Sequence, residues 1–186
     1  CQLQIKGYEG AKYKSFDTRE EAERALATSP YAYIGKNAKK KSEKVSSETL
    51  PACVIDNSLA VDAACSGNPG PMEYRGVHIA SRQEVFHFGP TKGTNNIGEF
   101  LAIVHGLALL KQKEFDMPIY SDSVNAISWV RQKKCKTKLP RTAETEELFK
   151  LIERAEKWLR ENTYTTRILK WETKEWGEIP ADFGRK

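Results

Sequence analysis

Five carboxylates in this sequence stand in phrases that are typical of tight turns and of the ends of strands and helices. They are Asp62 in LAVDAACSGNPGP, Glu99 in GTNNIGEFLAIVHGL, Asp122 in PIYSDSVNAISWV, and Glu178 with Asp182 in WGEIPADFGRK. The chain around them is basic, with 30 lysines and arginines against 25 acidic residues. Carboxylate oxygens select Mg²⁺ or Mn²⁺ over zinc. Clustered acids in a basic chain therefore predict a divalent-metal site that acts on a polyanion, with phosphodiester chemistry on nucleic acid as the expected class.

Each acid also has an ordinary explanation when it is considered alone. Asp122 could cap a helix, Glu99 could lie on a helix surface, and the last two acids could belong to a solvated tail. Asp62 differs because it lies in an apolar stretch, where a charge is costly unless it is paired or binds a metal. If the acids converge, two ions about 4 Å apart would activate a water molecule and stabilise the leaving oxygen at phosphorus.

The composition fits one ordinary domain with a small additional module. The chain has 186 residues, of which 39% are hydrophobic and 10% aromatic, so a core is expected. Its four cysteines are scattered without a C-x-x-C pair, which argues against a disulfide framework or a structural zinc site and favours a cytoplasmic location. No apolar run is long enough for a membrane span.

The chain divides into three parts. Residues 1–28 hold a short basic and aromatic segment followed by an expected helix, DTREEAERALA. Residues 29–52 contain a lysine run and serine clusters without apolar periodicity, which predicts a flexible basic linker. Residues 53–186 read as a single domain.

Within this domain the patterns predict strands in CVIDNSLAVDAA, YRGVHIA, EVFHFGP, MPIYS and TRILKWE. Helices are predicted from Thr94 or Asn95 onward, over SVNAISWVRQ, over AETEELFKLIERAEKWLRE, and in the tail EIPADFGRK. Three meandering strands followed by helix-linked strands make an α/β fold with a mixed five-stranded sheet. We expect helices on both of its faces.

This arrangement places the acids at one edge of the sheet. Asp62 lies in the first strand, which becomes central if the later strands add in parallel beside it. Asp122 ends a helix-linked strand, where open α/β sheets bind ligands, and Glu99 lies in the first turns of the preceding helix. Glu178 and Asp182 are four residues apart, so a helical tail would put both on one face.

The phrases DAACSGNPGP, GTNNIGEFLAIVHGL, IYSDSVNAISWV and LKWETKEWGEIPADFGRK resemble the type 1 ribonuclease H family, in particular its bacterial branch ending in WGEI-x-AD-x-GRK. The resemblance covers roughly residues 53–186. It implies a ribonuclease H-like fold and a Mg²⁺-dependent endonuclease, with Mn²⁺ as a possible substitute. Such an enzyme cuts the RNA strand of RNA–DNA hybrids and leaves 5′-phosphate and 3′-hydroxyl ends. The family's four metal ligands match Asp62, Glu99, Asp122 and Asp182, with Asp62 shared by both ions.

Two departures from the family are visible. Many members carry a histidine before the last acid, whereas here Glu178 stands where this branch uses an acid, which implies a catalytic role for it. His105 is about 240° around its helix from Glu99, so we expect it to be structural. The basic protrusion helix of some relatives is missing, because LPRTAETE joins two predicted helices directly.

The resemblance also implies contacts to both strands of a hybrid. Gly67, Asn68 and Asn95 would read the RNA strand, where 2′-hydroxyls line a shallow minor groove. The residues that would bind a DNA phosphate are Thr94, Asn96 and Thr137, the first two at a helix N-terminus. Trp129 would pack on deoxyribose, with core packing as its alternative, and the other three tryptophans are assigned to the core or its margin.

The N-terminal segment GYEGAKYKSFDTREEAERAL resembles the second half of a small hybrid-binding domain, also called caulimovirus viroplasmin-like. Tyr13 and Lys14 fall where that module places an aromatic and a basic residue on the hybrid. The residues given resemble only this second half, and about 28 residues are too few for an independent core.

Two other functions stay open. The chain could be a transposase-like or junction-resolving nuclease of the same fold that acts on DNA, although Gly67, Asn68 and Asn95 favour a 2′-hydroxyl reader. It could also bind hybrids without cutting them, although a pure binder would gain affinity by losing the acids. A monomer that does not engage membranes is expected in each case.

Overall fold

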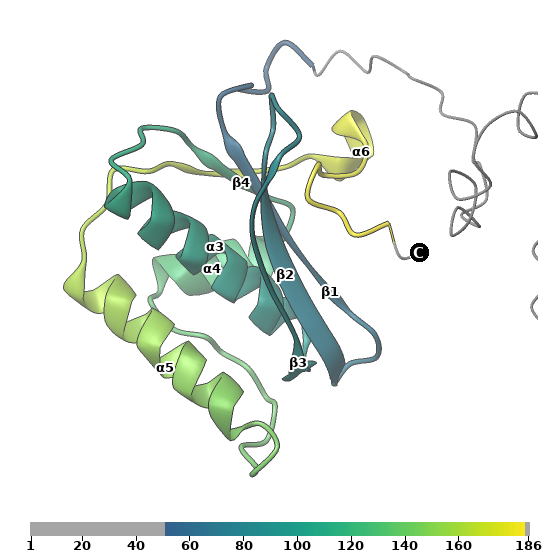
Figure 1. The fold of residues 1–186 in the computed structure, drawn as a ribbon, viewed down its shortest axis with the longest axis vertical. Helices are drawn as coiled ribbons and strands as arrows, with labels where there is room; N and C mark the ends of the chain where they lie inside the picture. Colours follow the sequence, from purple (N-terminus) through teal and green to yellow (C-terminus); the bar gives the residue numbers. More distant parts are fainter. Residues whose placement is uncertain (1–50, 185–186) are drawn as a thin grey trace, which may run out of the picture. The chain divides into compact units, whose positions relative to one another are not determined.

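The structure is a computed structural model that describes residues 51–184 (Figure 1). The predicted N-terminal module with Tyr13 and Lys14, and residues 29–50 of the predicted linker, lie outside the described residues. The strands are β1 (Leu59–Cys65), β2 (Gly70–His78), β3 (Glu84–Gly93), β4 (Ile119–Ser121) and β5 (Ile168–Lys170). The helices are α3 (Asn95–Gln112), α4 (Val124–Arg131), α5 (Glu146–Glu161) and α6 (Thr173–Trp176). No helix in this described part combines the length and apolar character needed to cross a membrane.

The five strands form one mixed sheet in the order β3-β2-β1-β4-β5. β1 pairs antiparallel with β2 and parallel with β4, so it occupies the central position that its buried sequence favours. β4 and β5 are parallel, as expected for strands joined through helices. The predicted order of elements up to β5 and the mixed five-stranded sheet are both confirmed.

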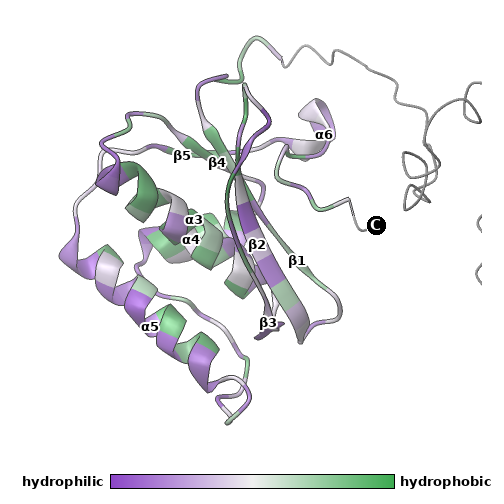
Figure 2. Ribbon diagram, viewed as in Figure 1, coloured by the Kyte–Doolittle hydropathy of each residue, from purple (hydrophilic) through white to green (hydrophobic). Residues whose placement is uncertain are grey.

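The two faces of the sheet carry different covers, because successive side chains of a strand point to opposite sides. Leu59, Val61 and Ala63 of β1 join the larger core, which α3, α4 and α5 complete on one face. Figure 1 shows these three helices on one side of the sheet and α6 on the other. Figure 2 shows α5 with hydrophobic and hydrophilic stripes, in keeping with a helix that buries one side only.

The second face carries a smaller core around Trp171 and the C-terminal segment. The fully buried Trp171 lies edge-on against Tyr120 and Trp176, and its indole nitrogen donates a hydrogen bond to the carbonyl of Gly177 at 2.9 Å. Ile179 and Ala181 complete this core. The last stretch of chain is therefore packed onto the sheet.

The predicted helix over EIPADFGRK is wrong. The last helix is the four-residue α6, and Gly177 ends it with a φ of 76°. Ile179 and Ala181 are both buried although they are two residues apart, a spacing that an extended chain satisfies on a flat surface and a helix does not. Glu178 and Asp182 therefore do not share a helical face.

Gly98 lets α3 approach the sheet closely, one residue before Glu99. A Cβ atom at position 98 would lie 2.7 Å from the Cβ of Ala63 and 2.8 Å from the sulfur of Met72. At Gly106, two turns later, the nearest atoms are the flexible ends of Ile119 and Leu59, at 3.0 and 3.1 Å. The first contact cannot relax without moving the helix or the strand.

We expect Gly98→Ala to destabilise the protein by about 1 kcal/mol or more, because overpacking outweighs the better helix propensity of alanine. Gly106→Ala is the matched control and should cost less, since side-chain ends can move aside. Urea unfolding of both variants measures the difference. Equal or smaller loss in Gly98→Ala would show that α3 is not held this closely.

Candidate metal centre

Three of the predicted acids meet at one point. Asp62 from β1, Glu99 from α3 and Asp122, directly after β4, each offer a carboxylate oxygen, and these oxygens lie within 4.8 Å of one another. Asp62 and Glu99 are 7% and 8% exposed. Charged groups this deeply buried and this close together repel one another unless a cation lies between them.

Local structure explains how each acid reaches this point. Asp62 projects from the central strand on the face opposite the larger core, and Glu99 follows the close approach at Gly98. Asp122 follows the last residue of β4, at the carboxyl end of a parallel strand. The cap of α4 is Ser123, whose hydroxyl accepts a hydrogen bond from the Ala126 amide at 3.2 Å, so Asp122 does not serve as the helix cap.

The electrostatics of the cluster reflect burial and mutual repulsion. Burial, followed by the charge of Asp122, raises the pKa of Asp62 to about 8. Burial also raises the pKa of Glu99 to about 7, opposed by the nearby Ser123 hydroxyl and increased by Asp122. The pKa of Asp122 is raised mainly by burial, while Lys170 opposes the rise. Without a cation, the site thus holds protons near neutral pH.

Glu99 shows most directly that the site fits a metal ion. One of its oxygens, Oε1, accepts a hydrogen bond from the Asn95 amide at 2.8 Å. The other, Oε2, is buried and has no hydrogen-bond partner in the described part of the chain. A buried carboxylate oxygen without a donor is costly, and three carboxylates are the donor set that Mg²⁺ or Mn²⁺ prefers. The residues present therefore fit a divalent cation.

Asp182 and Glu178 lie near this cluster without belonging to the three closest oxygens. The half-buried Asp182 adds its negative charge to both Asp62 and Asp122, and its Oδ2 accepts a hydrogen bond from the Gly184 amide at 2.8 Å. The exposed Glu178 contributes charge at Asp122. The structure thus places all five predicted acids in one electrostatic neighbourhood, with three of them in direct reach of a common point.

Lys170 is a neighbour of the site that the sequence analysis missed. It ends β5 opposite Ser121 of β4, and its charge lowers the pKa of Asp122 against the effect of burial. Its ammonium group also donates a hydrogen bond to the carbonyl of Trp171. The register of β4 against β5 would have revealed this neighbour, but the sequence alone does not give that register.

Comparison with known proteins agrees with this site. A family model described as RNase H matches residues 56–171, which is more than half of the chain and includes the three clustered acids. This chain belongs to the ribonuclease H family. A second model, described as Ribonuclease H1 N-terminal domain, matches residues 1–26. The chain therefore belongs to the type 1 ribonuclease H family and carries an N-terminal segment of the expected kind.

Individual relatives cover parts of the chain. It is 37% identical over 92 residues to a Ribonuclease H of Desulforamulus reducens, covering 41% of this chain and 57% of the relative. It is 39% identical over 85 residues to a Ribonuclease H of Sulfurovum sp., covering 40% and 56%. The aligned part thus spans about half the length of these relatives. Among solved structures, an RNase H1 isolated from compost matches with a TM-score of 0.43 and 17% identity, covering 64% of this chain and 87% of that one.

The ribonuclease H residues expected to read RNA lie beside the acids or in the adjoining turn. Asn95 is held against Glu99 by the hydrogen bond described above. Gly67 and Asn68 are exposed in the turn between β1 and β2, where Gly67 has a φ of 96° that disfavours other residues. A Cβ atom at Gly70 would come within 2.1 Å of the Ser66 carbonyl oxygen, so this turn also requires glycine at its end.

The residues expected to bind DNA occupy the start of α3 and the segments beyond it. Thr94 is the N-cap of α3, yet its side chain makes no capping hydrogen bond, and the neighbouring Asn96 is exposed. Thr137 accepts a hydrogen bond from the Leu139 amide at 3.1 Å. Trp129 is half-buried against the larger core, 6.4 Å from Phe100 between ring centroids. It therefore packs in the core and keeps part of its surface exposed.

The other aromatic residues behave structurally. His105 stacks on Phe86 with 4.0 Å between ring centroids, and burial lowers its pKa, which agrees with the structural role expected for it. Trp158 stacks on Tyr164 at the margin of the larger core, and Trp171 and Trp176 belong to the smaller core, as expected.

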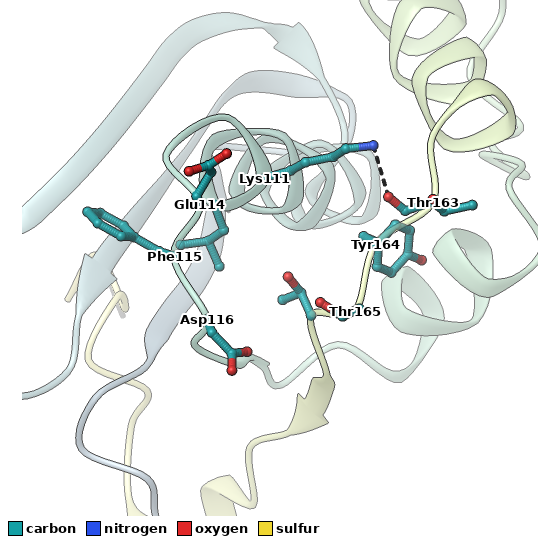
Figure 3. A pocket seen from close by; sticks show the side chains of 9 residues that line it. Lys111, Glu114, Phe115, Asp116, Thr163, Tyr164 and Thr165 are labelled. Carbon is teal, nitrogen blue, oxygen red and sulfur yellow. Dashed lines mark hydrogen bonds between the residues drawn. The ribbon is translucent and has the colours of Figure 1, made fainter.

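A separate groove of about 350 Å³ lies away from the acids (Figure 3). Its walls include Asp116, just before β4, and Thr163 and Tyr164, ahead of β5. Lys111 crosses it with a hydrogen bond to the Thr163 carbonyl at 2.9 Å. Because Asp122 follows the opposite end of β4, this groove is not part of the metal centre.

Proposed function

We propose that this ribonuclease H is a Mg²⁺-dependent endonuclease that hydrolyses the RNA strand of RNA–DNA hybrids and leaves 5′-phosphate and 3′-hydroxyl ends. The observation that carries the proposal is the meeting of Asp62, Glu99 and Asp122 within 4.8 Å, inside a segment that matches the ribonuclease H family model. The relatives named Ribonuclease H support the same activity.

In this proposal Asp62, Glu99, Asp122 and Asp182 hold two divalent ions, with Asp62 shared between them. When bound, the ions activate a water molecule and stabilise the leaving oxygen at phosphorus. The carboxylates must be deprotonated to bind, so the raised pKa values of Asp62 and Glu99 link metal binding to proton release. Asn95 holds one oxygen of Glu99, and the other is buried without a hydrogen-bond partner among the described residues, so it could bind an ion.

Glu178 has a separate task in this proposal. It is exposed and close enough for its charge to act on Asp122, so it would stand within reach of solvent beside the reacting phosphate. A carboxylate there also disfavours retention of the negatively charged product by repulsion. We therefore assign Glu178 to proton transfer or product release and not to metal binding.

Substrate selection follows from the surface next to the acids. Gly67, Asn68 and Asn95 would contact the 2′-hydroxyl groups that line the minor groove of the hybrid. Double-stranded DNA has no 2′-hydroxyl groups. The DNA strand would be held through a phosphate by Thr94, Asn96 and Thr137 and by packing against Trp129. We further propose that Tyr13 and Lys14 contribute to hybrid binding, and that the protein acts as a cytoplasmic monomer.

A panel of labelled duplexes tests this function against its alternatives. The full chain with Mg²⁺ should cut the RNA of an RNA–DNA hybrid and leave double-stranded DNA of the same sequence intact. Asp122→Asn should lose cleavage by about 10³-fold or more and keep its affinity for the hybrid, because the binding residues are unchanged. Cleavage of DNA would indicate a DNA nuclease of this fold. Binding without cleavage by the unaltered chain would indicate a hybrid-binding protein.

A further inference from the structure

Arg75 occupies a central place on the face of the sheet that carries the metal centre. In the sheet register it lies directly opposite Asp62 of β1 on one side and opposite His87 of β3 on the other. Directly paired residues project to the same face of a sheet. Arg75 is therefore a close neighbour of the central acid, although no motif in the sequence marks it.

The guanidinium group of Arg75 binds the C-terminal segment at three places. Its Nε donates a hydrogen bond to the carbonyl of Ala181 at 2.8 Å, and its Nη2 donates one to the carbonyl of Asp182 at 2.5 Å. The guanidinium carbon lies 4.6 Å from the centroid of the Phe183 ring. A planar fork with fixed donors suits such a double contact, and an aromatic face beside it adds a cation–π attraction.

These contacts hold the backbone of Asp182 and leave its carboxylate free of Arg75. The acceptors are main-chain carbonyls, while Oδ2 of Asp182 accepts from the Gly184 amide. The distinction matters because an arginine bound to the carboxylate itself would compete with a metal ion for the same oxygens. Arg75 instead holds the backbone of Asp182 in position.

The contacts of Arg75 with the backbone of Asp182 oppose electrostatic repulsion between this acid and the other acids of the site. The negative charge of Asp182 acts on both Asp62 and Asp122, so the three acids repel one another when no cation lies between them. Asp182 lies in a segment outside any helix or strand, beyond the buried Ile179 and Ala181. Packing of these two residues fixes the chain before the acid, and Arg75 adds the attachment at the acid itself.

We infer that Arg75 is a positioning residue that holds the Asp182 backbone so that its carboxylate reaches the metal centre. The inference rests on the proposed function for its catalytic consequence, while the placement of the C-terminal segment can be measured without catalysis. The competing explanation is that Arg75 only stabilises the fold. The two explanations differ in whether the effects of Arg75 and Asp182 substitutions are independent.

The test combines Arg75→Gln, Arg75→Lys and Asp182→Asn in the full chain, with Arg82→Gln as control. Arg82 is an exposed arginine in the turn between β2 and β3. Arg75→Gln should lower kcat on a hybrid by about tenfold to 100-fold and raise the Mg²⁺ concentration needed for half the maximal rate, with KM for the hybrid little changed. Arg75→Lys should be intermediate, and Arg82→Gln should match the unaltered protein.

The double variant decides between positioning and general stabilisation. In an Asp182→Asn background, Arg75→Gln should change kcat by less than about twofold, because the acid it positions is already removed. Independent, multiplicative losses would overturn the inference. So would an unaltered rate and Mg²⁺ dependence in Arg75→Gln.

Hydrogen exchange supplies a readout that does not depend on activity. In the metal-free protein, Arg75→Gln should speed amide exchange in residues 179–184 and leave α3 unchanged, with Arg75→Lys between the two. Unchanged exchange in this segment would overturn the inference even if the unaltered chain fails to cut hybrids, a failure that would count against the proposed function alone. If Arg75→Gln does not fold, Arg75→Lys replaces it, and wild-type rate and exchange in that variant would overturn the inference.

Discussion

Asp62→Asn should abolish cleavage and at the same time stabilise the metal-free protein. The activity falls because Asp62 is the central acid of the cluster, and losing metal stabilisation of about 4 kcal/mol in the transition state corresponds to about 10³-fold in rate. The fold gains because a buried charge next to two like charges is replaced by a neutral amide of the same shape. Function and stability should therefore change in opposite directions.

The gain in the free energy of unfolding should be larger at high pH than at low pH. At about pH 8.5 Asp62 is largely ionised in the folded protein, and Asp62→Asn should add on the order of 1–3 kcal/mol to the free energy of unfolding. At about pH 5 the folded protein already holds a proton on Asp62, so most of the gain should disappear. Urea unfolding in EDTA at both pH values measures it.

Asp56→Asn is the matched control for this substitution, because Asp56 is an exposed aspartate just before β1. It should change neither cleavage nor the stability difference between the two pH values. A loss of stability in Asp62→Asn at high pH would contradict the account, since it would mean that the carboxylate stabilises the metal-free fold.

The metal-free protein should lose stability as the pH rises from about 4 to about 8, and Mg²⁺ should reverse most of that loss. The pKa values of Asp62 and Glu99 are raised to about 8 and about 7 in the folded state, whereas unfolded carboxyl groups titrate near pH 4. In this window the folded state binds more protons than the unfolded state, so stability is greatest at low pH and declines as the folded groups ionise. Each such proton contributes at most about 1.4 kcal/mol per pH unit.

Metal binding should oppose this decline because it requires ionised carboxylates. The rise in melting temperature on adding excess Mg²⁺ should therefore be larger at about pH 8.5 than at about pH 5.5. Thermal melts in EDTA and in Mg²⁺ across this range measure both effects. If the stability of the metal-free protein rises with pH between about pH 4 and 8, these acids are not buried as described. If the stabilisation by Mg²⁺ is the same at both pH values, the metal binds at a different site. Asp62→Asn should flatten both curves.

Local sequence patterns were enough to predict most of the fold. Three patterns predicted the order of elements and the central place of β1. They are the alternation of apolar and polar residues in β2 and β3, the apolar run around Asp62, and the short buried strand before Asp122. The meeting of three acids followed from that topology, because the carboxyl ends of neighbouring parallel strands share an edge.

The C-terminal segment was harder to predict because tertiary contacts decide its conformation. The tail contains helix-compatible residues, but Gly177 ends α6 and the burial of Ile179 and Ala181 on the sheet requires an extended path. The role of Arg75 could not be predicted from the sequence for a related reason. Its acceptors are main-chain carbonyls 106 and 107 residues further along the chain, and no side-chain pattern marks such atoms.

The contacts with the hybrid were expected from family resemblance and not from local sequence patterns. The structure places Asn95 against Glu99 and Gly67 in a turn that needs glycine, which suits the contacts expected of them. Tyr13 and Lys14 stay predictions, since they lie outside the described residues. A hybrid-binding comparison between the full chain and Tyr13→Ala would address them.

The most direct test of the central claim is cleavage of an RNA–DNA hybrid, with the RNA strand labelled at its 5′ end, by the full chain in Mg²⁺ and in EDTA. We expect internal cuts in the RNA with Mg²⁺, 3′-hydroxyl ends on the labelled fragments, an intact DNA strand, and no cutting in EDTA. RNA cleavage that persists undiminished in EDTA, or an intact hybrid in the presence of Mg²⁺ and correctly folded protein, would contradict it.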